Sequence, residues 1–389
     1  MSESYEQVTY AGKTEFLPYT VLEAAYARME YLVRSYDDII VTYSGGKDSG
    51  LTLELLRRTY DKMGMTARPV RFSFVDMEFI EDEVIRTVET YFADPRFEGC
   101  WIAAPQVEPM VVIGERKNVI LWDKTRKDKW GRLPPEHAVL TVPGLGKNEP
   151  FVREHERRAI VACMKPKGRA VLINSHRFTE NEMIRMVLMK GQPETCWVFK
   201  HTEGMKGVDL ARPIYDWSVK DVFRFFYEEG VPYTLAYDIN MHSGSALRAG
   251  TPPLDLVTSG KLEGLRQSYP TLFTQITTMW PEMLTHERYA QDIDIEGTVA
   301  RYARGWGGMT QYVRENIADP VAQALAMKAI HKARTCRDGQ RLRGKGAAPC
   351  YNMPLLWVWQ NLVNGNYRRG IPKKHNPTRA MIAFEEPRP

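Results

Sequence analysis

The chain has 389 residues, of which 43% are hydrophobic and 26% charged, a composition that fits one large globular domain with appendages or two domains. No apolar run approaches the length of a membrane span, and the polar, acidic N-terminus is not a secretory signal, so we expect a cytoplasmic protein with no membrane partner. The net charge of +5 suits an anionic ligand but does not by itself imply nucleic acid.

A helix and a buried strand are the first elements that the sequence predicts. Apolar side chains recur with a helical period across residues 19–36. The β-branched run of residues 39–42 (Ile-Ile-Val-Thr) then predicts a buried strand, and residues 51–58 predict a helix. Between this strand and this helix lies a glycine-rich loop, residues 43–50 (Tyr-Ser-Gly-Gly-Lys-Asp-Ser-Gly).

A strand, a glycine turn and a helix in this order favour a phosphate-binding site. The glycines let the backbone come close to a ligand. The free N–H groups of the first helical turn point at an anion, which the helix dipole also favours. Lys47 adds a full positive charge, and Ser44 and Ser49 add hydroxyl donors. The predicted ligand-binding residues of the loop are Tyr43, Ser44, Gly45, Gly46, Lys47, Asp48 and Ser49.

The spacing of the loop is neither that of a Walker A motif nor that of a dinucleotide-binding G-x-G-x-x-G. The string Ser-Gly-Gly-Lys-Asp-Ser instead resembles the PP-loop of the adenine nucleotide α-hydrolase superfamily, which includes ATP pyrophosphatases and phosphoadenosine phosphosulfate (PAPS) reductases. The resemblance implies an α/β fold with a doubly wound, mostly parallel sheet, and ATP or PAPS as the ligand. A glycine turn with incidental charges is the alternative.

A second strand is predicted over residues 69–76, followed by a helix from about residue 81 to residue 92. It ends in Asp76, at the carboxyl edge where open α/β sheets bind ligands. Asp76 could therefore meet a ribose hydroxyl or a metal, or it could cap the helix. The segment resembles the V-D-T-G stretch of PAPS reductases, with Met77 and Glu78 in place of Thr and Gly.

Residues 114–150 follow a predicted third strand at 101–104 and interrupt the alternation of strands and helices, which indicates an insertion in the α/β core. Basic residues stand beside Trp122 and Trp130, a combination that fits a nucleic-acid surface. A solvated loop with two anchoring tryptophans is the alternative that we favour. The basic residues are Arg116, Lys117, Lys124, Arg126, Lys127, Lys129 and Arg132.

A helix over residues 152–163 and a strand over residues 170–175 are predicted next. In the PAPS reductase-like family, the corresponding strand ends in an arginine-bearing segment that faces the nucleotide or the substrate. The resemblance therefore makes Arg177, and less closely Arg185, predicted anion contacts. For His176, we favour a structural role over that of a catalytic base.

Residues 213–222 resemble the P-I-x-x-W-s-x-x-D-V segment that follows the sheet in PAPS reductases. Asp216 or Ser218 is predicted to cap a helix that stops near Gly230. Because this segment and the PP-loop agree in order and spacing, we expect a nucleotide-binding domain over residues 1–240.

The C-terminal part, residues 241–389, is predicted to be mainly helical and basic. Tryptophans at 357 and 359 lie among the arginines and lysines of residues 334–379. This segment could bind nucleic acid or another polyanion, as could residues 114–132, or it could be a solvated surface that folds against the core.

The cysteines argue against part of the chemistry that the resemblance suggests. Their number is odd and none forms a C-x-x-C pair, so we expect neither a disulfide framework, nor a zinc finger, nor an iron–sulfur cluster. PAPS reductases also need a nucleophilic cysteine in a C-terminal E-C-G-L-H motif, which this sequence lacks. The five cysteines are Cys100, Cys163, Cys196, Cys336 and Cys350.

Three functions are therefore open. The first is an enzyme that cleaves ATP at the α-phosphate, releases pyrophosphate and adenylates an acceptor, with Lys47, Asp48 and Arg177 as catalytic residues and Mg²⁺ neutralising the pyrophosphate. The second is a PAPS or adenosine phosphosulfate reductase. The third is a non-catalytic regulator of transcription or defence, because the chain is similar to divergent PAPS reductase-like proteins of phages and mobile elements, including co-activators of prophage gene expression. That similarity implies a phage context and a ParB-like protein partner.

Overall fold

The chain forms two compact units. The computed structural model describes residues 7–9, 16–112, 115–177, 197–242, 249–252, 254, 262–289, 295–342, 353–363, 365, 367, 381 and 384. Unit 1 comprises Met1–Glu108, Ile120–Pro252 and Gly264–Gln275, and unit 2 comprises Pro109–Val119, Pro253–Glu263 and Ile276–Pro389. The boundary near residue 240 stays a prediction. In the described part of the chain, no helix has the length and apolar character needed to cross a membrane.

Unit 1 is built on a six-stranded sheet with the order β10–β11–β9–β3–β4–β5. β10 runs antiparallel to β11, and the other neighbouring pairs are parallel. The predicted α/β fold with a mostly parallel sheet is therefore confirmed. The strands are β3 (Asp38–Tyr43), β4 (Val70–Val75), β5 (Phe97–Ile102), β9 (Ala170–Ile173), β10 (Val198–Phe199) and β11 (Val208–Ala211).

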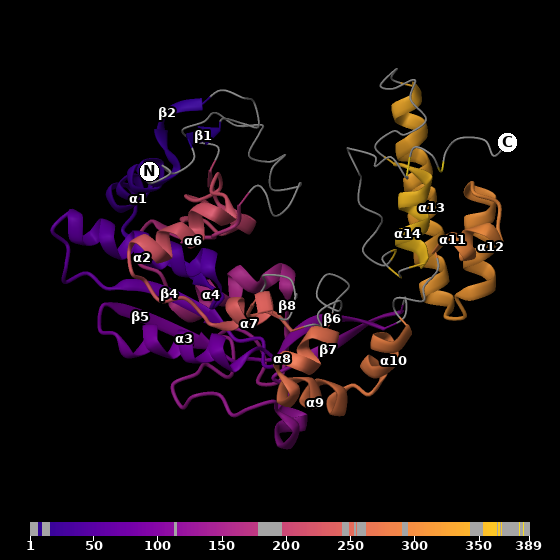
Figure 1. Ribbon diagram of the computed structural model, residues 1–389, viewed down its shortest axis with the longest axis horizontal. Helices are drawn as coiled ribbons and strands as arrows, with labels where there is room; N and C mark the ends of the chain where they lie inside the picture. Colours follow the sequence, from indigo (N-terminus) through magenta and orange to yellow (C-terminus); the bar gives the residue numbers. More distant parts are fainter. Residues whose placement is uncertain are drawn as a thin grey trace. The chain divides into compact units, whose positions relative to one another are not determined.

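Helices cover both faces of this sheet. Because successive strand residues point to opposite faces, Ile40 and Leu172 pack with α4, whereas Tyr43 and Phe72 pack with Tyr91 of α3. The α2 helix packs against α1 and α6 (Figure 1). The helices of this unit are α1 (Val21–Ser35), α2 (Lys47–Lys62), α3 (Asp82–Ala93), α4 (Glu156–Met164), α6 (Val219–Glu228) and α7 (Ala236–His242), with short 3₁₀ turns at Lys124–Lys129, Arg153–His155 and Thr202–Gly204.

Two of these helices begin at capping boxes. The Thr20 hydroxyl accepts from Glu23 N at the start of α1, and the Glu23 carboxylate accepts from Thr20 N. Ser218 forms the same arrangement at the start of α6, so Ser218 rather than Asp216 is the cap. Asp216 instead forms a buried salt bridge with Arg28 at 2.7 Å.

The sheet changes winding direction next to β3. From β3 the chain moves through α2 to β4 and then through α3 to β5, while β9 and β11 lie on the other side of β3. The loop after β3 therefore lies at a topological switch point, where open α/β sheets form a crevice at the carboxyl ends of their strands. The fold places the predicted phosphate site at this crevice.

Several strands lie outside the predicted set. β1 (Gln7–Thr9) pairs with β2 (Phe16–Thr20), and β6 (Gln106–Val112), β7 (Glu115–Leu121) and β8 (Phe151–Val152) form a three-stranded sheet. The insertion is thus partly a strand structure. The sequence pattern does not indicate these strands, because β6 contains a proline and β7 begins with charged and amide side chains.

The C-terminal part of the chain is helical, as predicted, with helices α8 (Leu262–Ser268), α9 (Pro270–Met279), α10 (Glu282–Tyr289), α11 (Ile295–Ala300), α12 (Trp306–Asn316), α13 (Pro320–Leu342) and α14 (Leu355–Val363). In unit 2 the fully buried Trp359 packs with Met309, Val313 and Val358. The sequence predicts a loop at residues 305–308, which is wrong because α12 begins at Trp306. Gly308 is needed there because it lies against the Ala303 backbone with no space for a side chain.

Candidate functional site

The glycine loop joins β3 to α2 in a conformation that only glycine allows. Gly45 has a φ of +77°, and a Cβ on it would overlap with Val84 of α3. Gly46 is the N-cap residue of α2 in extended conformation and, as a glycine, has no side chain to cap the helix. Binding of an anion by the N–H groups of this first turn stays a prediction.

The two predicted serines hold the loop in shape. Ser44 N donates to Ser49 Oγ at 3.2 Å, and the two hydroxyl oxygens lie 3.1 Å apart. Ser49 Oγ also donates to Gly46 O at 3.1 Å. Gly250 covers the outside of the loop, since a Cβ there would lie 2.5 Å from Ser44 O.

Lys47, Asp48 and Arg177 form one charged group, although Arg177 comes from the end of another strand. Lys47 Nζ lies 2.9 Å from one Asp48 oxygen, and Arg177 Nε donates to the other at 2.7 Å. Their side chains are 7%, 16% and 2% exposed, respectively. One carboxylate between two cations leaves a single net positive charge at the start of α2, which suits a phosphate.

Parallel pairing brings Arg177 to this place. β9 lies beside β3, and Thr42 Oγ1 donates to Ile173 O at 2.9 Å. Beyond the strand, the hydroxyls of Ser175 and Thr52 of α2 lie 2.8 Å apart. The segment that follows β9 is thereby fixed against α2, and Arg177 NH1 also donates to Trp217 O at 3.3 Å.

Tyr237 of α7 is a residue at the loop that the sequence analysis does not include. Its hydroxyl accepts from the backbone N–H of Lys47 at 2.9 Å, and its ring centroid lies 5.1 Å from Lys47 Nζ. It thus occupies one donor of the helix start and holds Lys47 from the side. Because 190 positions separate the two residues, no local pattern could reveal the contact.

Tyr43 contributes its backbone rather than its side chain to the site. Its ring is 3% exposed and packs edge-on against Tyr91 with the centroids 5.2 Å apart. Burial raises the pKa of the Tyr43 hydroxyl well above its ordinary value, so the hydroxyl stays neutral. A small pocket beside the loop is lined by residues of the loop itself and by Tyr91, Phe226 and Tyr233.

Asp76 lies at the carboxyl end of β4, but its carboxylate contacts protein donors on both oxygens. One oxygen accepts from Glu78 N and from Arg132, and the other accepts from Trp101 Nε1 at 2.8 Å. The residue is fully buried. Asp76 does not cap the following helix, whose N-cap is Glu81. A ribose contact of Asp76 stays a prediction, and the contacts present are those of a structural anchor.

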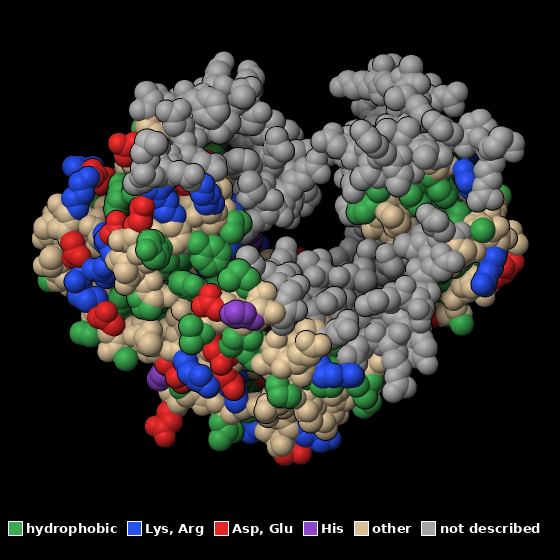
Figure 2. Space-filling view, viewed as in Figure 1, with side chains coloured by type: hydrophobic (Ala, Val, Ile, Leu, Met, Phe, Trp, Pro, Cys, Tyr) green, Lys and Arg blue, Asp and Glu red, His purple; other side chains and the backbone are tan. Residues whose placement is uncertain are grey.

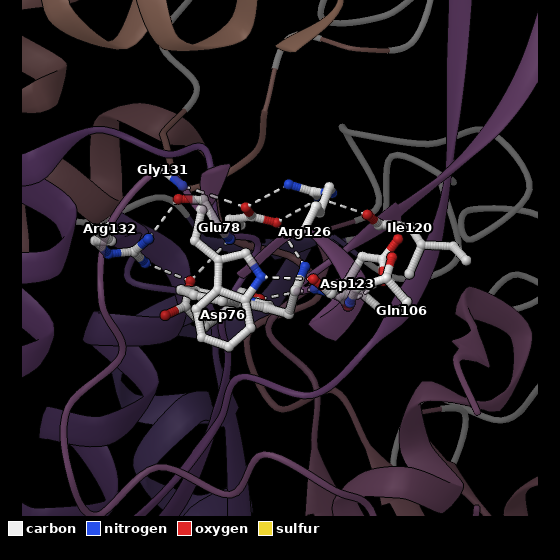
Figure 3. Close-up of polar contacts among 11 residues, drawn as sticks. Asp76, Glu78, Gln106, Ile120, Asp123, Arg126, Gly131 and Arg132 are labelled. Atoms are coloured by element: carbon white, nitrogen blue, oxygen red, sulfur yellow. Dashed lines mark hydrogen bonds and ion pairs between the residues drawn. The ribbon is translucent and has the colours of Figure 1, made fainter. Parts of the chain in front are cut away.

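Glu78 forms the second half of this buried network (Figure 3). Its carboxylate accepts from Arg126 at 3.0 and 2.9 Å and from Trp122 N at 2.6 Å. Glu78 and Trp122 both have positive φ values, of 60° and 52°. Two non-glycine residues in this region of backbone space indicate that the surrounding contacts dictate the conformation.

The network changes the interpretation of the insertion. Arg126 and Arg132, two of the basic residues predicted for a nucleic-acid surface, point at Glu78 and Asp76 (Figure 3). Trp122 is fully buried, as the anchoring alternative predicts. On the described surface in Figure 2, Lys and Arg side chains are interspersed with Asp and Glu side chains. Nucleic-acid binding by this segment stays a prediction.

The residues at the loop do not fit a protein-held magnesium ion. Both Asp48 oxygens form salt bridges with cations. Within the described ranges, no group of three or more His, Cys, Asp or Glu side chains is arranged to hold a metal. Binding of Mg²⁺ together with a nucleotide stays a prediction.

Some predicted residues lie outside the described residues. They are Arg185, Cys196, Cys350 and the basic residues Arg343, Lys345, Arg368, Arg369, Lys373, Lys374 and Arg379. The described cysteines, Cys100, Cys163 and Cys336, are half-buried and lie outside any disulfide.

The fold and the loop together define an α/β protein with a glycine-rich loop at the switch point of a mostly parallel sheet. No protein-family model matches the chain. The chain is 25% identical over 247 residues to the uncharacterized protein YbdN of Escherichia coli (strain K12). The match covers 60% of this chain and 58% of YbdN, so the chain spans less than two thirds of that relative.

Two solved structures are similar over 59% of the chain. One is the FMN adenylyltransferase of Candida glabrata in complex with FMN and the ATP analogue AMPCPP, at a TM-score of 0.35, 10% identity and 64% coverage of that chain. The other is the PAPS reductase of Candida auris in a phosphate complex, at a TM-score of 0.30, 11% identity and 95% coverage of that chain. Both scores are too low to carry an argument, so the function is argued from the residues of the site.

Proposed function

We propose that the protein binds an adenine nucleotide at the glycine loop and cleaves ATP at the α-phosphate, releasing pyrophosphate and adenylating an acceptor. The observation that carries this proposal is the helix start at the switch point, where the N-cap residue Gly46 supplies no side-chain cap and where the buried Lys47 lies. Such a helix start favours phosphate through its N–H groups and its dipole. The similarity of the loop to the PP-loop supports adenine as the base.

The charged group supplies the chemistry that this reaction needs. The acceptor oxygen forms a bond to the α-phosphorus, the bond from that phosphorus to the bridging oxygen breaks, and the acceptor proton leaves to solvent. Negative charge develops on the departing pyrophosphate, where the N–H groups of α2 and the Lys47 ammonium can stabilise it. The buried Arg177 fixes Asp48, which in turn positions Lys47.

A non-catalytic nucleotide-binding regulator is the second candidate. Asp48, the carboxylate next to Lys47, is held by two cations and cannot readily take the acceptor proton. Tyr237 also occupies the Lys47 N–H. These contacts are compatible with binding without turnover.

The reductase hypothesis and the phage context rest on the sequence and not on contacts in the structure. Cys100, Cys163 and Cys336 lie on β5, α4 and α13, not on the elements that carry the glycine loop. The phage context and the ParB-like partner rest on the sequence resemblance, and a DNA-shift assay with and without ATP tests the nucleic-acid hypothesis.

The test of the proposed function has a binding step and a product step. Calorimetry with ATP, AMP, adenosine phosphosulfate and PAPS, each with and without Mg²⁺, establishes which nucleotide binds. Chromatography of ATP reactions then distinguishes AMP with pyrophosphate, the expected pair, from ADP with phosphate. ATP binding without AMP formation, with water or added acceptors, favours the regulator. The absence of adenine-nucleotide binding contradicts both.

A further inference from the structure

A second group of basic side chains lies beside the glycine loop, at the carboxyl ends of β9 and β11. These strands are parallel neighbours, with Ala211 paired to Ile173. Arg212 directly follows β11, His176 follows β9 by three residues, and Arg157 comes from α4. Asn174 N donates to Ala211 O at 2.9 Å, and His176 N donates to Asn174 Oδ1 at 3.1 Å, which holds His176 near Arg212. The charges of Arg212 and Arg157 both act on the imidazole.

Arg212 is the unusual member of this basic cluster. Its guanidinium lies over the Phe199 ring at 4.7 Å, and its Nε is buried without a hydrogen-bond partner. Within the part of the chain that the structure describes, no carboxylate pairs with it. Arg212 is half-buried, and a buried Nε–H without an acceptor is unfavourable, because a donor removed from water needs a hydrogen-bond partner.

Other arginines at this edge of unit 1 are paired. Arg177 pairs with Asp48 at 2.7 Å, and Arg126 pairs with Glu78 at 2.9 Å. Arg157, the neighbour of Arg212, pairs with Glu203 at 2.7 Å. Within the described residues, the salt bridge of this basic cluster is that of Arg157 with Glu203, and the carboxyl of Glu156, whose pKa is raised by burial, also lies near Arg157.

The pKa values of Arg212 and His176 are both lowered, which agrees with an excess of positive charge in the basic cluster. Desolvation and the charge of Arg157 lower the pKa of Arg212 to about 10. Desolvation of the imidazole, followed by the charges of Arg212 and Arg157, lowers the pKa of His176 to about 4. His176 still keeps an exposed face, so a ligand can reach it. A bound anion would offset the repulsion within the cluster.

The basic cluster is close to the glycine loop but separate from it. His176 directly precedes Arg177, which pairs with Asp48 of the glycine loop at 2.7 Å, so the basic cluster adjoins the loop. The hydroxyl pair of Ser175 and Thr52, 2.8 Å apart, fixes the intervening segment to α2. A ligand whose phosphates bind at α2 could therefore place a second anionic group, or meet a second anionic molecule, near Arg212.

We propose that Arg212, Arg157 and His176 form a second anion subsite, which takes a phosphate or sulfate group other than the one held by the glycine loop. As part of the nucleotide site, this subsite rests on the proposed function. It makes the proposed function more specific, since either the nucleotide or the second substrate must then carry a further phosphate or sulfate group.

The test follows the His176 imidazole by NMR while inorganic phosphate is added at constant ionic strength, and His176→Gln assigns the signal. Wild-type protein should show a saturable shift. Arg212→Met should weaken the apparent affinity at least tenfold. Arg86→Met is the matched control, because it removes an exposed arginine of α3 with a side chain 69% exposed, and it should leave the titration unchanged. An unaltered titration in Arg212→Met overturns the proposal.

Stability measurements separate a ligand-binding role from a structural one. If Arg212 binds an anion, Arg212→Met should be as stable as the wild type in the absence of phosphate. Added phosphate should then raise the melting temperature of the wild type but not that of Arg212→Met. If Arg212 is structural, through its contact with Phe199, the variant should melt at a lower temperature and both proteins should respond equally to phosphate. That result contradicts the proposal.

Two further arms separate this subsite from the glycine loop. Lys47→Ala should leave phosphate binding at His176 within twofold of the wild type, even if ATP binding fails, so the two proposals can fail independently. Titrations in saturating AMP and in saturating ATP identify the source of the anion. Exclusion of phosphate by ATP alone means that the nucleotide supplies the group, and exclusion by neither nucleotide points to a second substrate. If saturating phosphate leaves the His176 NMR signal of the wild type unchanged, the proposed subsite is wrong.

Discussion

Removing the Lys47 ammonium should weaken ATP binding about 30- to 150-fold. The Lys47 side chain is 7% exposed at the start of α2, where a charge-assisted hydrogen bond to phosphate contributes about 2 kcal/mol, or about 30-fold. Truncation also leaves one Asp48 oxygen without its cation at 2.9 Å. That carboxylate then repels the phosphates, which raises the loss to about 3 kcal/mol, or about 150-fold.

The measurement is calorimetry of Lys47→Ala with ATP at low and high salt. Lys62→Ala is the matched control, because Lys62 is on the same helix, has a side chain 65% exposed and pairs with Glu30 at the surface. Asp48→Asn in the Lys47→Ala background should restore part of the lost affinity, since it removes the repulsion. Equal ATP affinities of Lys47→Ala and Lys62→Ala would refute the assignment of the glycine loop as the phosphate site.

Three further predictions concern stability. Gly45→Ala should lower the free energy of unfolding in urea by about 3 kcal/mol, because strain at positive φ adds to an overlap with Val84. Gly64→Ala is the control, since Gly64 has a φ of +72° in open space, and it should lower the free energy of unfolding by about 1 kcal/mol. Equal costs would contradict the close packing of the loop. Asp76→Asn should lower the unfolding free energy by about 3 kcal/mol, since it breaks the buried pair with Arg132, and a loss below about 0.5 kcal/mol would contradict the anchoring role. The pKa of His176 is about 4 in the folded state, against an ordinary value of 6.5, so the unfolded chain binds the proton more readily. The wild type should therefore lose stability as the pH falls from 6.5 to 4. In urea unfolding over that pH range, the midpoint of His176→Asn should fall less than that of the wild type.

The glycine loop could be predicted because its chemistry is local. A buried strand, two glycines, a lysine and a helix follow one another in the sequence, and the structure has the same order from Asp38 to Lys62. Arg177 could also be placed, because it follows a strand, and the carboxyl ends of parallel strands share one edge of the sheet. Its contact with Asp48 agrees with that expectation.

The partners of Asp76 and Glu78 were not predictable in the same way. Arg132 and Arg126 lie about 50 positions further along the chain, in an insertion where basic residues beside tryptophans equally suit a nucleic-acid surface. Only the tertiary fold shows that these two guanidinium groups neutralise two buried carboxylates. Tyr237 was missed for a related reason, because it meets Lys47 across 190 positions.

The distribution of paired and unpaired charge is therefore more informative about function than the net charge of +5. Arg28, Arg126 and Arg132 are bound to Asp216, Glu78 and Asp76 and serve the fold. Two places at the carboxyl edge of the sheet keep positive charge in excess. One is the start of α2, where Lys47 and Arg177 share a single carboxylate. The other surrounds Arg212, which stacks on Phe199 with a buried Nε that has no hydrogen-bond partner. Because excess buried charge destabilises an empty protein, two such places on one edge favour a ligand with two anionic groups, or two anionic ligands, over a single phosphate.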